Sequence, residues 1–258
     1  MVGESLKAKI AAGAVVSGPI VAEIRSPGGI KALALAGHDF VWLDMEHAMY
    51  GWETLHWVIQ YARAVGIAPL VRVTDLSYAA IARALDAGAV GVVVPRVETV
   101  AQVQEAVGCA RYPPDGRRGA GGEARVLYEP STPAEAIARV DAETVVVVQV
   151  ETVGAAEQVD AIAAVPGVDV VCLGPQDLSI SLGIPGQFDD PRFVEAVTHV
   201  IERTVAAGNA AGMVERAVDR FERWHAAGAR FMACNTDLAM IAAAARSDVA
   251  ALRVLSGA

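Results

Sequence analysis

Lysine is almost missing from this sequence. The 258 residues include only Lys7, Lys9 and Lys31, all near the N-terminus. An enzyme that works through a Schiff base needs a lysine amine at its catalytic centre. No lysine accompanies the chemistry-bearing residues described below, so a Schiff-base mechanism is not expected. A metal ion is then left as the group that could draw electrons from a substrate.

Excess positive charge and long apolar runs are missing too. The formal net charge is −9, whereas proteins that bind nucleic acid normally present a basic face, so we expect no nucleic-acid partner. No uninterrupted apolar run reaches the roughly 18 residues of a membrane span, and the N-terminus carries charges where a signal peptide needs an apolar centre. We therefore expect no membrane partner. The three cysteines are odd in number and lack metal-site spacing, which indicates reduced thiols in a cytoplasmic protein.

Aromatic residues are few, at 5%, although hydrophobic residues make up 54% of the chain. The apolar mass is mostly alanine and valine, which suits helices packed against parallel strands. Short β-branched runs recur and alternate with Ala-rich stretches of helical period, several of which end in glycine. Because the strands are runs rather than alternations, we expect both of their faces to be buried. They lie at residues 15–23, 39–46, 68–73, 90–97, 144–151, 168–174, 211–214 and 230–235.

Eight alternations of strand and helix predict an α/β fold, a (β/α)8 TIM barrel formed by residues 1–258 as one domain. A doubly wound nucleotide-binding sheet would need GxGxxG directly after an early strand. The only glycine cluster, GAGG at 119–122, lies far from any strand end. We interpret residues 111–132 as a loop over the barrel mouth. Residues 236–258 predict a helical extension, apolar enough to pack on a neighbouring subunit.

Polar side chains gather at the carboxyl ends of the predicted strands, where barrels of this kind carry their chemistry. The amino ends carry no comparable set, and this asymmetry favours an enzyme. The set comprises Asp44, Glu46 and His47 from the second strand, Arg72 from the third, Pro95 and Arg96 from the fourth, Gln149 and Glu151 from the fifth, Gly174, Pro175, Gln176 and Asp177 after the sixth, and Asn235 from the eighth.

Glu151 and Asp177 come from successive strands and could act together. Two carboxylates can bind one hard divalent cation and leave positions for water and substrate oxygens. Without a metal, two close carboxylates could instead share a proton for acid–base work. Asp177 could also be a plain helix cap within GPQDLS, and Glu151 a surface residue.

The stretch GPQDLS has a second possible use, because the N–H groups at a helix start receive anionic oxygens well. A carboxylate held there, with its neighbouring carbonyl on a metal, describes a bound 2-oxo acid. Arg72 could face the same carbonyl or an oxyanion formed from it. The alternative is that Arg72 is an ion-pair partner of Glu46 or Glu151, and both roles are compatible.

His47 is the candidate general acid or base near neutral pH, with Asp44 as the carboxylate that would orient its ring. The alternative is a solvated histidine at a strand end. No serine or cysteine lies in an activating motif.

Together these stretches resemble the HpcH/HpaI aldolase family, class II pyruvate aldolases that include 4-hydroxy-2-oxoheptanedioate and 2-keto-3-deoxy sugar-acid aldolases. The resemblance covers nearly the whole chain. It implies a barrel of the phosphoenolpyruvate/pyruvate-domain type and a hexamer that exchanges its terminal helices. The matching stretches are VWLDMEHA at 41–48, LVRV at 70–73, ALDAGAVGVVVPRVET at 84–99, ARYPPDGRRG at 110–119, VQVET at 148–152 and GVDVVCLGPQDLSISLG at 167–183.

Carried over by position, the resemblance implies a role for each motif residue. Glu151 and Asp177 would ligate a divalent ion (Mg2+ or Mn2+, with Co2+ as a further candidate), which pyruvate would chelate. Arg72 would stabilise the pyruvate enolate, and His47 with Asp44 would move the proton of the aldol hydroxyl. The implied substrate contacts are Arg72, Gln149, Gly174, Pro175, Gln176, Asp177 and, facing the aldehyde, Val214.

The chain departs from the family pattern at RGAGG, where Gly122 replaces the usual serine, and at Gln176, where a small residue is usual. We therefore expect a metal-dependent lyase that reversibly cleaves 4-hydroxy-2-oxo acids to pyruvate and an aldehyde. The alternatives are oxaloacetate decarboxylation, lysis of an acyl-CoA ester, and a non-catalytic barrel that binds carboxylates.

Overall fold

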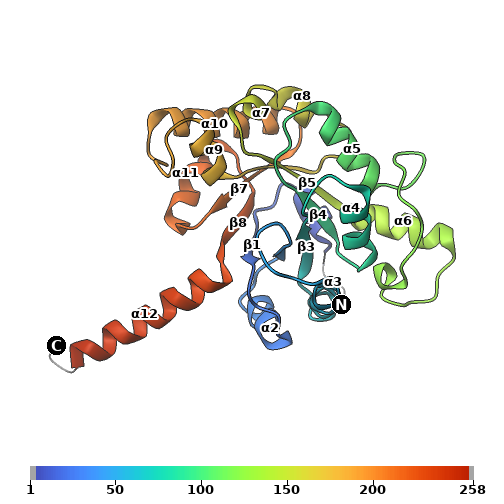
Figure 1. The fold of residues 1–258 in the computed structure, drawn as a ribbon, viewed down its shortest axis with the longest axis horizontal. Coiled ribbons are helices and arrows are strands. Elements are labelled where there is room, and N and C mark those ends of the chain that lie inside the picture. Colours follow the sequence, from blue (N-terminus) through green and yellow to red (C-terminus); the bar gives the residue numbers. More distant parts are fainter. Residues whose placement is uncertain (1–3, 256–258) are drawn as a thin grey trace.

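The computed structural model describes residues 4–255 and forms a closed barrel of eight parallel strands in the order β1 to β8. The predicted (β/α)8 fold is confirmed, and each predicted strand segment contains or overlaps one strand of the barrel (Figure 1). The strands are β1 (Val16–Val21), β2 (Phe40–Asp44), β3 (Ala68–Arg72), β4 (Gly91–Val94), β5 (Val145–Val150), β6 (Val170–Leu173), β7 (Ala210–Glu215) and β8 (Phe231–Thr236).

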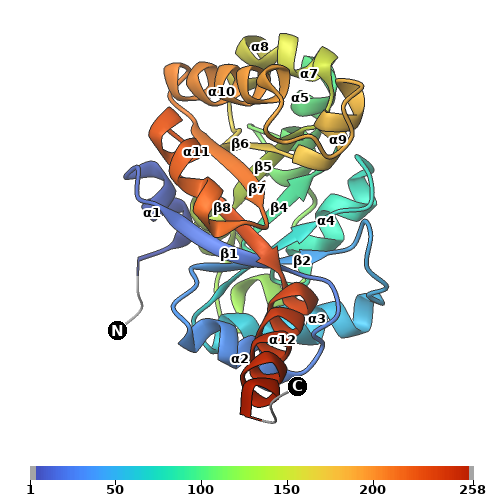
Figure 2. The ribbon, with the colours of Figure 1, turned by 90° about the vertical axis from the view of Figure 1, so that its left-hand side faces the viewer.

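Helices surround the barrel and one of them projects from it (Figures 1 and 2). They are α1 (Leu6–Ala11), α2 (Pro27–Leu35), α3 (Trp52–Ala64), α4 (Tyr78–Asp86), α5 (Val100–Ala110), α6 (Pro133–Glu143), α7 (Val153–Glu157), α8 (Val159–Ala163), α9 (Pro175–Ser181), α10 (Pro191–Ala206), α11 (Phe221–Ala227) and α12 (Asp237–Leu255), with the short 3-10 helices η1 (Glu123–Val126) and η2 (Val218–Arg220). Among residues 4–255, none of these helices is both long enough and apolar enough to cross a membrane.

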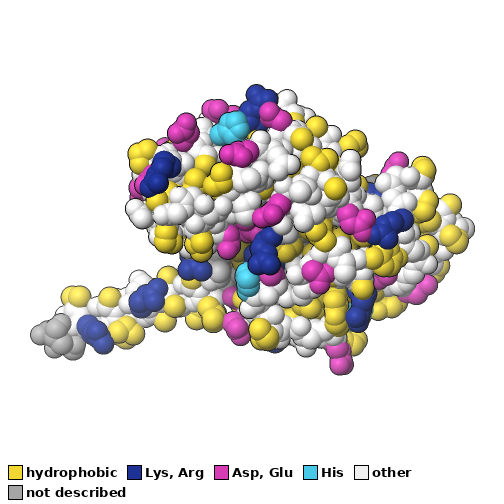
Figure 3. All heavy atoms as spheres, turned by 45° about the horizontal axis from the view of Figure 1, so that its top comes forward, with side chains coloured by type: hydrophobic (Ala, Val, Ile, Leu, Met, Phe, Trp, Pro, Cys, Tyr) yellow, Lys and Arg dark blue, Asp and Glu magenta, His cyan; other side chains and the backbone are white. Residues whose placement is uncertain are grey.

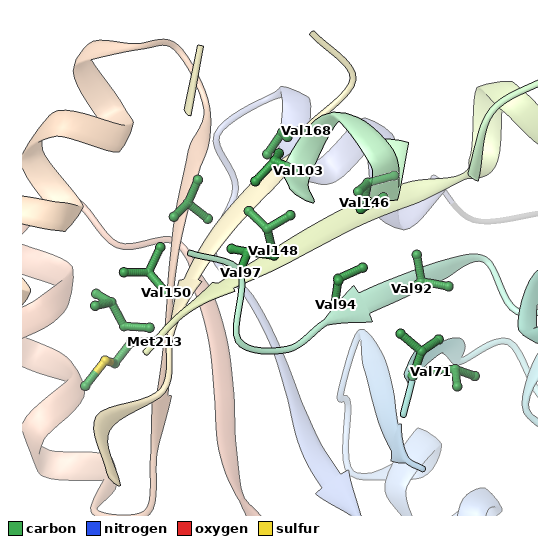
Figure 4. Packing of buried hydrophobic residues seen from close by; sticks show 14 of the residues in the cluster. Val71, Val92, Val94, Val97, Val103, Val146, Val148, Val150, Val168 and Met213 are labelled. Carbon is green, nitrogen blue, oxygen red and sulfur yellow. The ribbon is translucent and has the colours of Figure 1, made fainter. Parts of the chain in front are cut away.

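The strands are apolar on both faces because two layers of side chains cover them. Inside the barrel, the rings of Phe40 and Phe231 stack with their centroids 4.5 Å apart. Outside, valines of β3, β4 and β5 pack with Val103 of α5 in the layer between strands and helices (Figure 4). Continuous valine runs such as Val145–Val148 are therefore the expected pattern for a strand buried on both sides.

Strand register brings the site residues to one level. Asp44 at the end of β2 lies directly opposite Arg72 at the end of β3. Gln149 near the end of β5 pairs with Cys172 of β6, two residues before Gly174. Because all strands are parallel, their last residues surround a single mouth.

Residues 111–132 do not form the predicted loop over this mouth. They follow α5 and pack along the outside of the barrel, where Arg118 forms an ion pair with Asp86 and the Tyr78 hydroxyl accepts a hydrogen bond from the N–H of Gly119. Tyr112 and Val126 form a small core with α6. None of these residues lines the cavity at the strand ends. A connection that follows a helix starts at the amino end of the barrel, which is why the prediction was wrong.

The predicted C-terminal extension is the single helix α12, which leaves the barrel after β8 (Figures 1 and 2). Most of its large apolar side chains are exposed, and Figure 3 shows hydrophobic side chains along the projecting arm. These exposed residues are Leu238, Ile241, Val249, Leu252, Val254 and Leu255.

Asp237 joins α12 to the barrel. Its carboxylate is 1% exposed, and Oδ2 accepts hydrogen bonds from the backbone N–H groups of Ala22, Glu23 and Ile24, at 3.2, 2.8 and 2.7 Å. Oδ1 accepts a hydrogen bond from the N–H of Leu238. One carboxylate thus accepts hydrogen bonds from backbone N–H groups both after β1 and in the first turn of α12.

We expect Asp237→Ala to lower the free energy of unfolding by about 3 kcal/mol, because several buried N–H groups would lose a charged acceptor. Urea denaturation followed by circular dichroism measures the change. Asp115→Ala, which removes an exposed carboxylate, is the control and should change the value by less than about 0.5 kcal/mol. A loss for Asp237→Ala no larger than that of the control would contradict the bridging role.

Candidate active site

A cavity of about 420 Å³ opens at the carboxyl ends of the strands. Its walls come from the ends of β1, β2, β3, β5, β7 and β8, from the start of α9, and from the segments after β7. Every residue to which the sequence assigned a catalytic, metal-binding or substrate-binding role lies around it: Asp44, His47, Arg72, Gln149, Glu151, Gly174, Pro175, Gln176, Asp177 and Val214. Of the other strand-end residues, Asn235 also lines the cavity, whereas Glu46, Pro95 and Arg96 do not.

Glu151 is a buried carboxylate just beyond β5, with 3% of its surface exposed. Its pKa is raised to about 7, mainly by burial. The negative charges of Asp177 and Glu46 add to the rise, while the hydrogen bond from the Arg96 N–H and the charge of Arg72 oppose it. Oε1 accepts a hydrogen bond from Gln149 Nε2 at 3.1 Å, and Oε2 accepts one from the Arg96 N–H at 2.9 Å. The carboxylate is therefore held firmly in a place where negative charge is unfavourable.

Gln149 supplies an oxygen that has no partner. Its Oε1 is buried and accepts no hydrogen bond from any residue in the described range 4–255, while its Nε2 is used by Glu151. A buried, unpaired carbonyl oxygen costs free energy, and an ion or bound molecule at this point would satisfy it.

The donor set fits a hard divalent cation. Carboxylate and amide oxygens are the ligands that Mg2+ and Mn2+ prefer, and a cation would offset the repulsion that raises the pKa of Glu151. Among residues 4–255, no group of three or more His, Cys, Asp or Glu side chains is arranged to hold a metal. The carboxylate pair Glu151 and Asp177 would therefore leave several coordination positions to water and substrate oxygens.

Gly174, which caps the start of α9, leaves room for the carboxylate of Glu151. A Cβ atom at this position would overlap Oε1 of Glu151. The sequence GPQDLS thus needs its glycine for space beside Glu151, while Asp177 lies in the first turn of α9.

Arg72 faces the carboxylates from β3 and is 9% exposed. Its Nε and Nη2 donate to the two oxygens of Asp44 at 2.9 and 2.6 Å, and Nη1 lies 3.3 Å from Glu46 Oε2. Burial alone would raise the pKa of Asp44, but the hydrogen bonds and charge of Arg72 outweigh it and hold the pKa below its usual value. Asp44 therefore remains a carboxylate that fixes the guanidinium plane.

The side chain of Asp44 does not pair with the ring of His47 as predicted. Asp44 accepts hydrogen bonds from the backbone N–H groups of Glu46 and His47, at 3.0 and 3.3 Å, and thereby fixes the turn after β2. The carboxylate near the imidazole is Glu46, with Oε2 3.7 Å from Nε2 of His47. The His47 side chain is 64% exposed, so its ring is free to meet a ligand in the cavity.

Two residues at strand ends have left-handed backbone conformations that L-residues rarely adopt. Arg96, after β4, has φ 51° and uses its N–H to hold Glu151. Asn235, within β8, has φ 61° and lines the cavity. Such strain is kept where surrounding structure requires it, most often at functional sites.

The sequence pattern does not single out several residues that line the cavity. β7 runs one residue beyond its predicted end, so Glu215 and the positions after it face the mouth. The same argument from strand ends would have found them if that boundary had been placed correctly. These additional residues are Ile20, Ala22, Phe188, Glu215, Arg216, Ala217, Arg220 and Thr236.

Known proteins resemble both the sequence and the fold. A 5-keto-4-deoxy-D-glucarate aldolase from Shigella boydii is 34% identical over 224 residues, which is 86% of each chain. The crystal structure of an HpcH/HpaI aldolase from Desulfitobacterium hafniense superposes with a TM-score of 0.92, at 32% identity over 97% of both chains. Citrate synthase SbnG superposes with a TM-score of 0.88, at 31% identity over 98% of this chain and 99% of the other.

The family model described as HpcH/HpaI aldolase/citrate lyase matches residues 23–244, a range that includes every residue of the predicted site. Because the family model matches most of the chain and the aldolase from Shigella boydii is 34% identical over 86% of it, the protein belongs to the HpcH/HpaI aldolase/citrate lyase family.

Proposed function

We propose that the protein is a divalent-metal-dependent aldolase that reversibly cleaves 4-hydroxy-2-oxo acids to pyruvate and an aldehyde. Membership of the aldolase family supports carbon–carbon bond cleavage as its reaction. The observation that carries the proposal is the buried Glu151 carboxylate, which feels the charge of Asp177 and lies in one cavity with the unpaired amide oxygen of Gln149 and with Arg72.

Glu151 and Asp177 would hold the cation, which we propose to be Mg2+ or Mn2+, with Co2+ as a further candidate. A divalent ion there supplies Lewis-acid polarisation of a carbonyl group. The N–H groups in the first turn of α9 are unpaired by the helix itself and would bind the substrate carboxylate beside Gly174. Gln149 would orient both the carboxylate of Glu151 and the bound 2-oxo acid.

Arg72 would stabilise the negative charge that develops on the keto oxygen as the carbon–carbon bond breaks. The bidentate pair with Asp44 holds the guanidinium in one orientation before substrate arrives, so little reorganisation is needed during the reaction. Glu46 contacts the remaining Nη1 and keeps the side chain from turning away.

His47 would accept the proton of the 4-hydroxyl group in cleavage and return it in the reverse direction. Its exposed ring lies at the cavity, and Glu46 is the carboxylate beside it. Asp44 would position His47 by accepting hydrogen bonds from the backbone of the turn that carries it. The proposed proton-handling group therefore has three residues, Asp44, Glu46 and His47.

Assembly and location complete the proposal. We propose a homo-oligomer, a hexamer, in which α12 packs on a neighbouring copy, because its apolar side chains are exposed. A groove of about 520 Å³ formed by β1, β8, α11 and the first turns of α12, lined by Val15, Met232 and Met240 among others, offers an apolar surface for such a helix from a neighbouring copy. The three unpaired, buried cysteines suit the reducing cytoplasm.

Glu151→Gln and Asp177→Asn should each lower kcat/KM by about 100-fold or more, because each removes a charged ligand of the cation. Pyruvate release from 4-hydroxy-2-oxo acids, with and without EDTA, measures the effect, and Mn2+ binding followed by electron paramagnetic resonance should weaken in parallel. Glu157→Gln, on the nearby helix α7, is the control. Full activity of either ligand variant, insensitive to EDTA, would overturn the metal assignment.

Arg72→Lys and His47→Ala should separate two steps of the reaction. Arg72→Lys keeps the charge but loses the bidentate geometry, so both aldol cleavage and exchange of the pyruvate methyl protons should slow about 100-fold. His47→Ala should slow cleavage to a similar extent and leave the exchange, measured by proton NMR in D2O, within a few-fold of wild type. Loss of exchange in His47→Ala would show that this residue moves the methyl proton instead.

Charges placed among the exposed apolar side chains of α12 should prevent assembly. Ile241→Asp combined with Leu252→Asp would put two carboxylates into the proposed helix interface, and we expect monomers by size-exclusion chromatography with light scattering. Ser247→Asp, near the opposite face of the helix, is the matched control and should leave the oligomer intact. An unchanged mass for the double variant would exclude α12 as the contact.

A further inference from the structure

Trp42 lies beneath the cavity, and the steps above leave it unused. Side chains alternate between the two faces of a strand, so Trp42, two residues before Asp44 on β2, points to the same inner face at a deeper level. Its ring is completely buried inside the barrel and is not among the side chains that line the cavity. Any effect of Trp42 on the reaction must therefore pass through a neighbouring side chain.

The indole N–H of Trp42 has no hydrogen-bond acceptor within residues 4–255. The other fully buried tryptophan, Trp224, donates its N–H to Glu215 Oε2 at 3.4 Å. A buried donor without an acceptor costs free energy, and a phenylalanine ring would fill an apolar interior without that cost. The favourable contribution of Trp42 therefore comes from its ring.

The ring of Trp42 contacts the guanidinium of Arg72. The Cζ atom of Arg72 lies over the ring, 5.6 Å from its centroid, which is within the range of a cation–π interaction. Two other arginines of the described chain lie over an indole ring, Arg83 and Arg223, and both are exposed. Because water weakens this attraction, we expect the buried pair of Trp42 and Arg72 to be the strongest of the three.

The indole and the carboxylates support Arg72 in different ways. Asp44 and Glu46 contact the nitrogen atoms of the guanidinium, and each brings a full negative charge that offsets the charge of Arg72. An indole face attracts a cation but adds no net charge. The contact with Trp42 can therefore hold the guanidinium and exclude water from its inner side without reducing the attraction of Arg72 for an anionic oxygen.

We propose that Trp42 is a positioning residue for Arg72, whose ring holds the guanidinium toward the keto oxygen of the bound 2-oxo acid. This inference rests on the proposed function, in which Arg72 stabilises the negative charge that develops on that oxygen. The contribution of Trp42 should then appear mainly when the oxygen becomes anionic and only weakly in the binding of the ketone itself.

Binding of two small ligands to the Mn2+-loaded full-length protein tests this difference. Oxalate is a planar dianion that resembles the pyruvate enolate, whereas pyruvate is the ground-state ketone. Trp42→Met and Trp42→Leu, which remove the aromatic face, should each weaken oxalate binding about 10-fold in isothermal titration and pyruvate binding less than about 3-fold. Trp42→Phe keeps an aromatic face without the N–H and should stay within about 3-fold of wild type for both ligands.

Phe40→Leu is the matched control for loss of packing. Phe40 precedes Trp42 by two residues on β2, and its ring stacks on Phe231 inside the same barrel. It should lower the melting temperature by an amount similar to Trp42→Leu, measured by circular dichroism. The ratio of oxalate to pyruvate affinity should stay at the wild-type value in Phe40→Leu, because this ring does not support the guanidinium.

A double-mutant cycle shows whether Trp42 acts through Arg72. In the wild-type background, Trp42→Met should lower kcat for exchange of the pyruvate methyl protons about 10-fold and change KM little. In the Arg72→Gln background, where no cation remains over the ring, the same substitution should lower kcat less than about 3-fold. Proton NMR in D2O measures both rates.

Three results would overturn the inference. Trp42→Phe could be as impaired as Trp42→Met and Trp42→Leu, the ring-deleted variants could weaken oxalate and pyruvate equally, or their effect could persist undiminished with Arg72→Gln. Failure of the aldolase function is distinct, because wild type would then neither bind oxalate with Mn2+ nor exchange the methyl protons of pyruvate.

Discussion

Closure of the parallel sheet, through the pairing of β1 with β8, is the constraint on which the site depends. Once the barrel closes, residues from strands far apart in sequence end at one mouth. Pairing of adjacent strands already makes Asp44 and Arg72 direct neighbours and places Glu151 beside Gly174 and the backbone of Arg96. The curvature of the closed barrel then brings Arg72 and Glu46 close enough to Glu151 for their charges to act on its pKa. The two apolar layers hold this frame rigidly, so polar groups at the mouth can be kept in arrangements that would relax in a flexible loop.

Charge at the mouth is balanced in two ways. Arg72 is neutralised by Asp44 and Glu46, and these contacts leave its orientation fixed. Among residues 4–255, Glu151 accepts hydrogen bonds only from the Arg96 N–H and from Gln149, and its pKa is raised to about 7, mainly by burial. The buried oxygen of Gln149 beside this carboxylate accepts no hydrogen bond within residues 4–255. A cation bound by Glu151 could also satisfy that oxygen, whereas a proton shared by the two carboxylates would not, and this is the physical basis for the proposed metal.

The cavity wall after β7 and β8 has a different character. Here the unsatisfied groups are donors, and Glu215 supports their backbone instead of neutralising Arg216. The proteins that resemble this chain include an aldolase and a citrate synthase, so the fold alone does not determine the reactants. Arg216 and Asn235 both line this part of the cavity.

The sequence by itself determined the barrel, because valine runs such as 145–148 bury both strand faces whatever their neighbours. It also determined which residues reach the mouth, since position at a strand end follows from local pattern: Glu151, Asp177 and Arg72 all line the cavity. The tertiary structure decided the partners. Asp44 binds Arg72 rather than the His47 ring, residues 111–132 pack outside the barrel, and Arg216 joins the cavity. These outcomes depend on side-chain contacts between distant segments, which no local periodicity encodes.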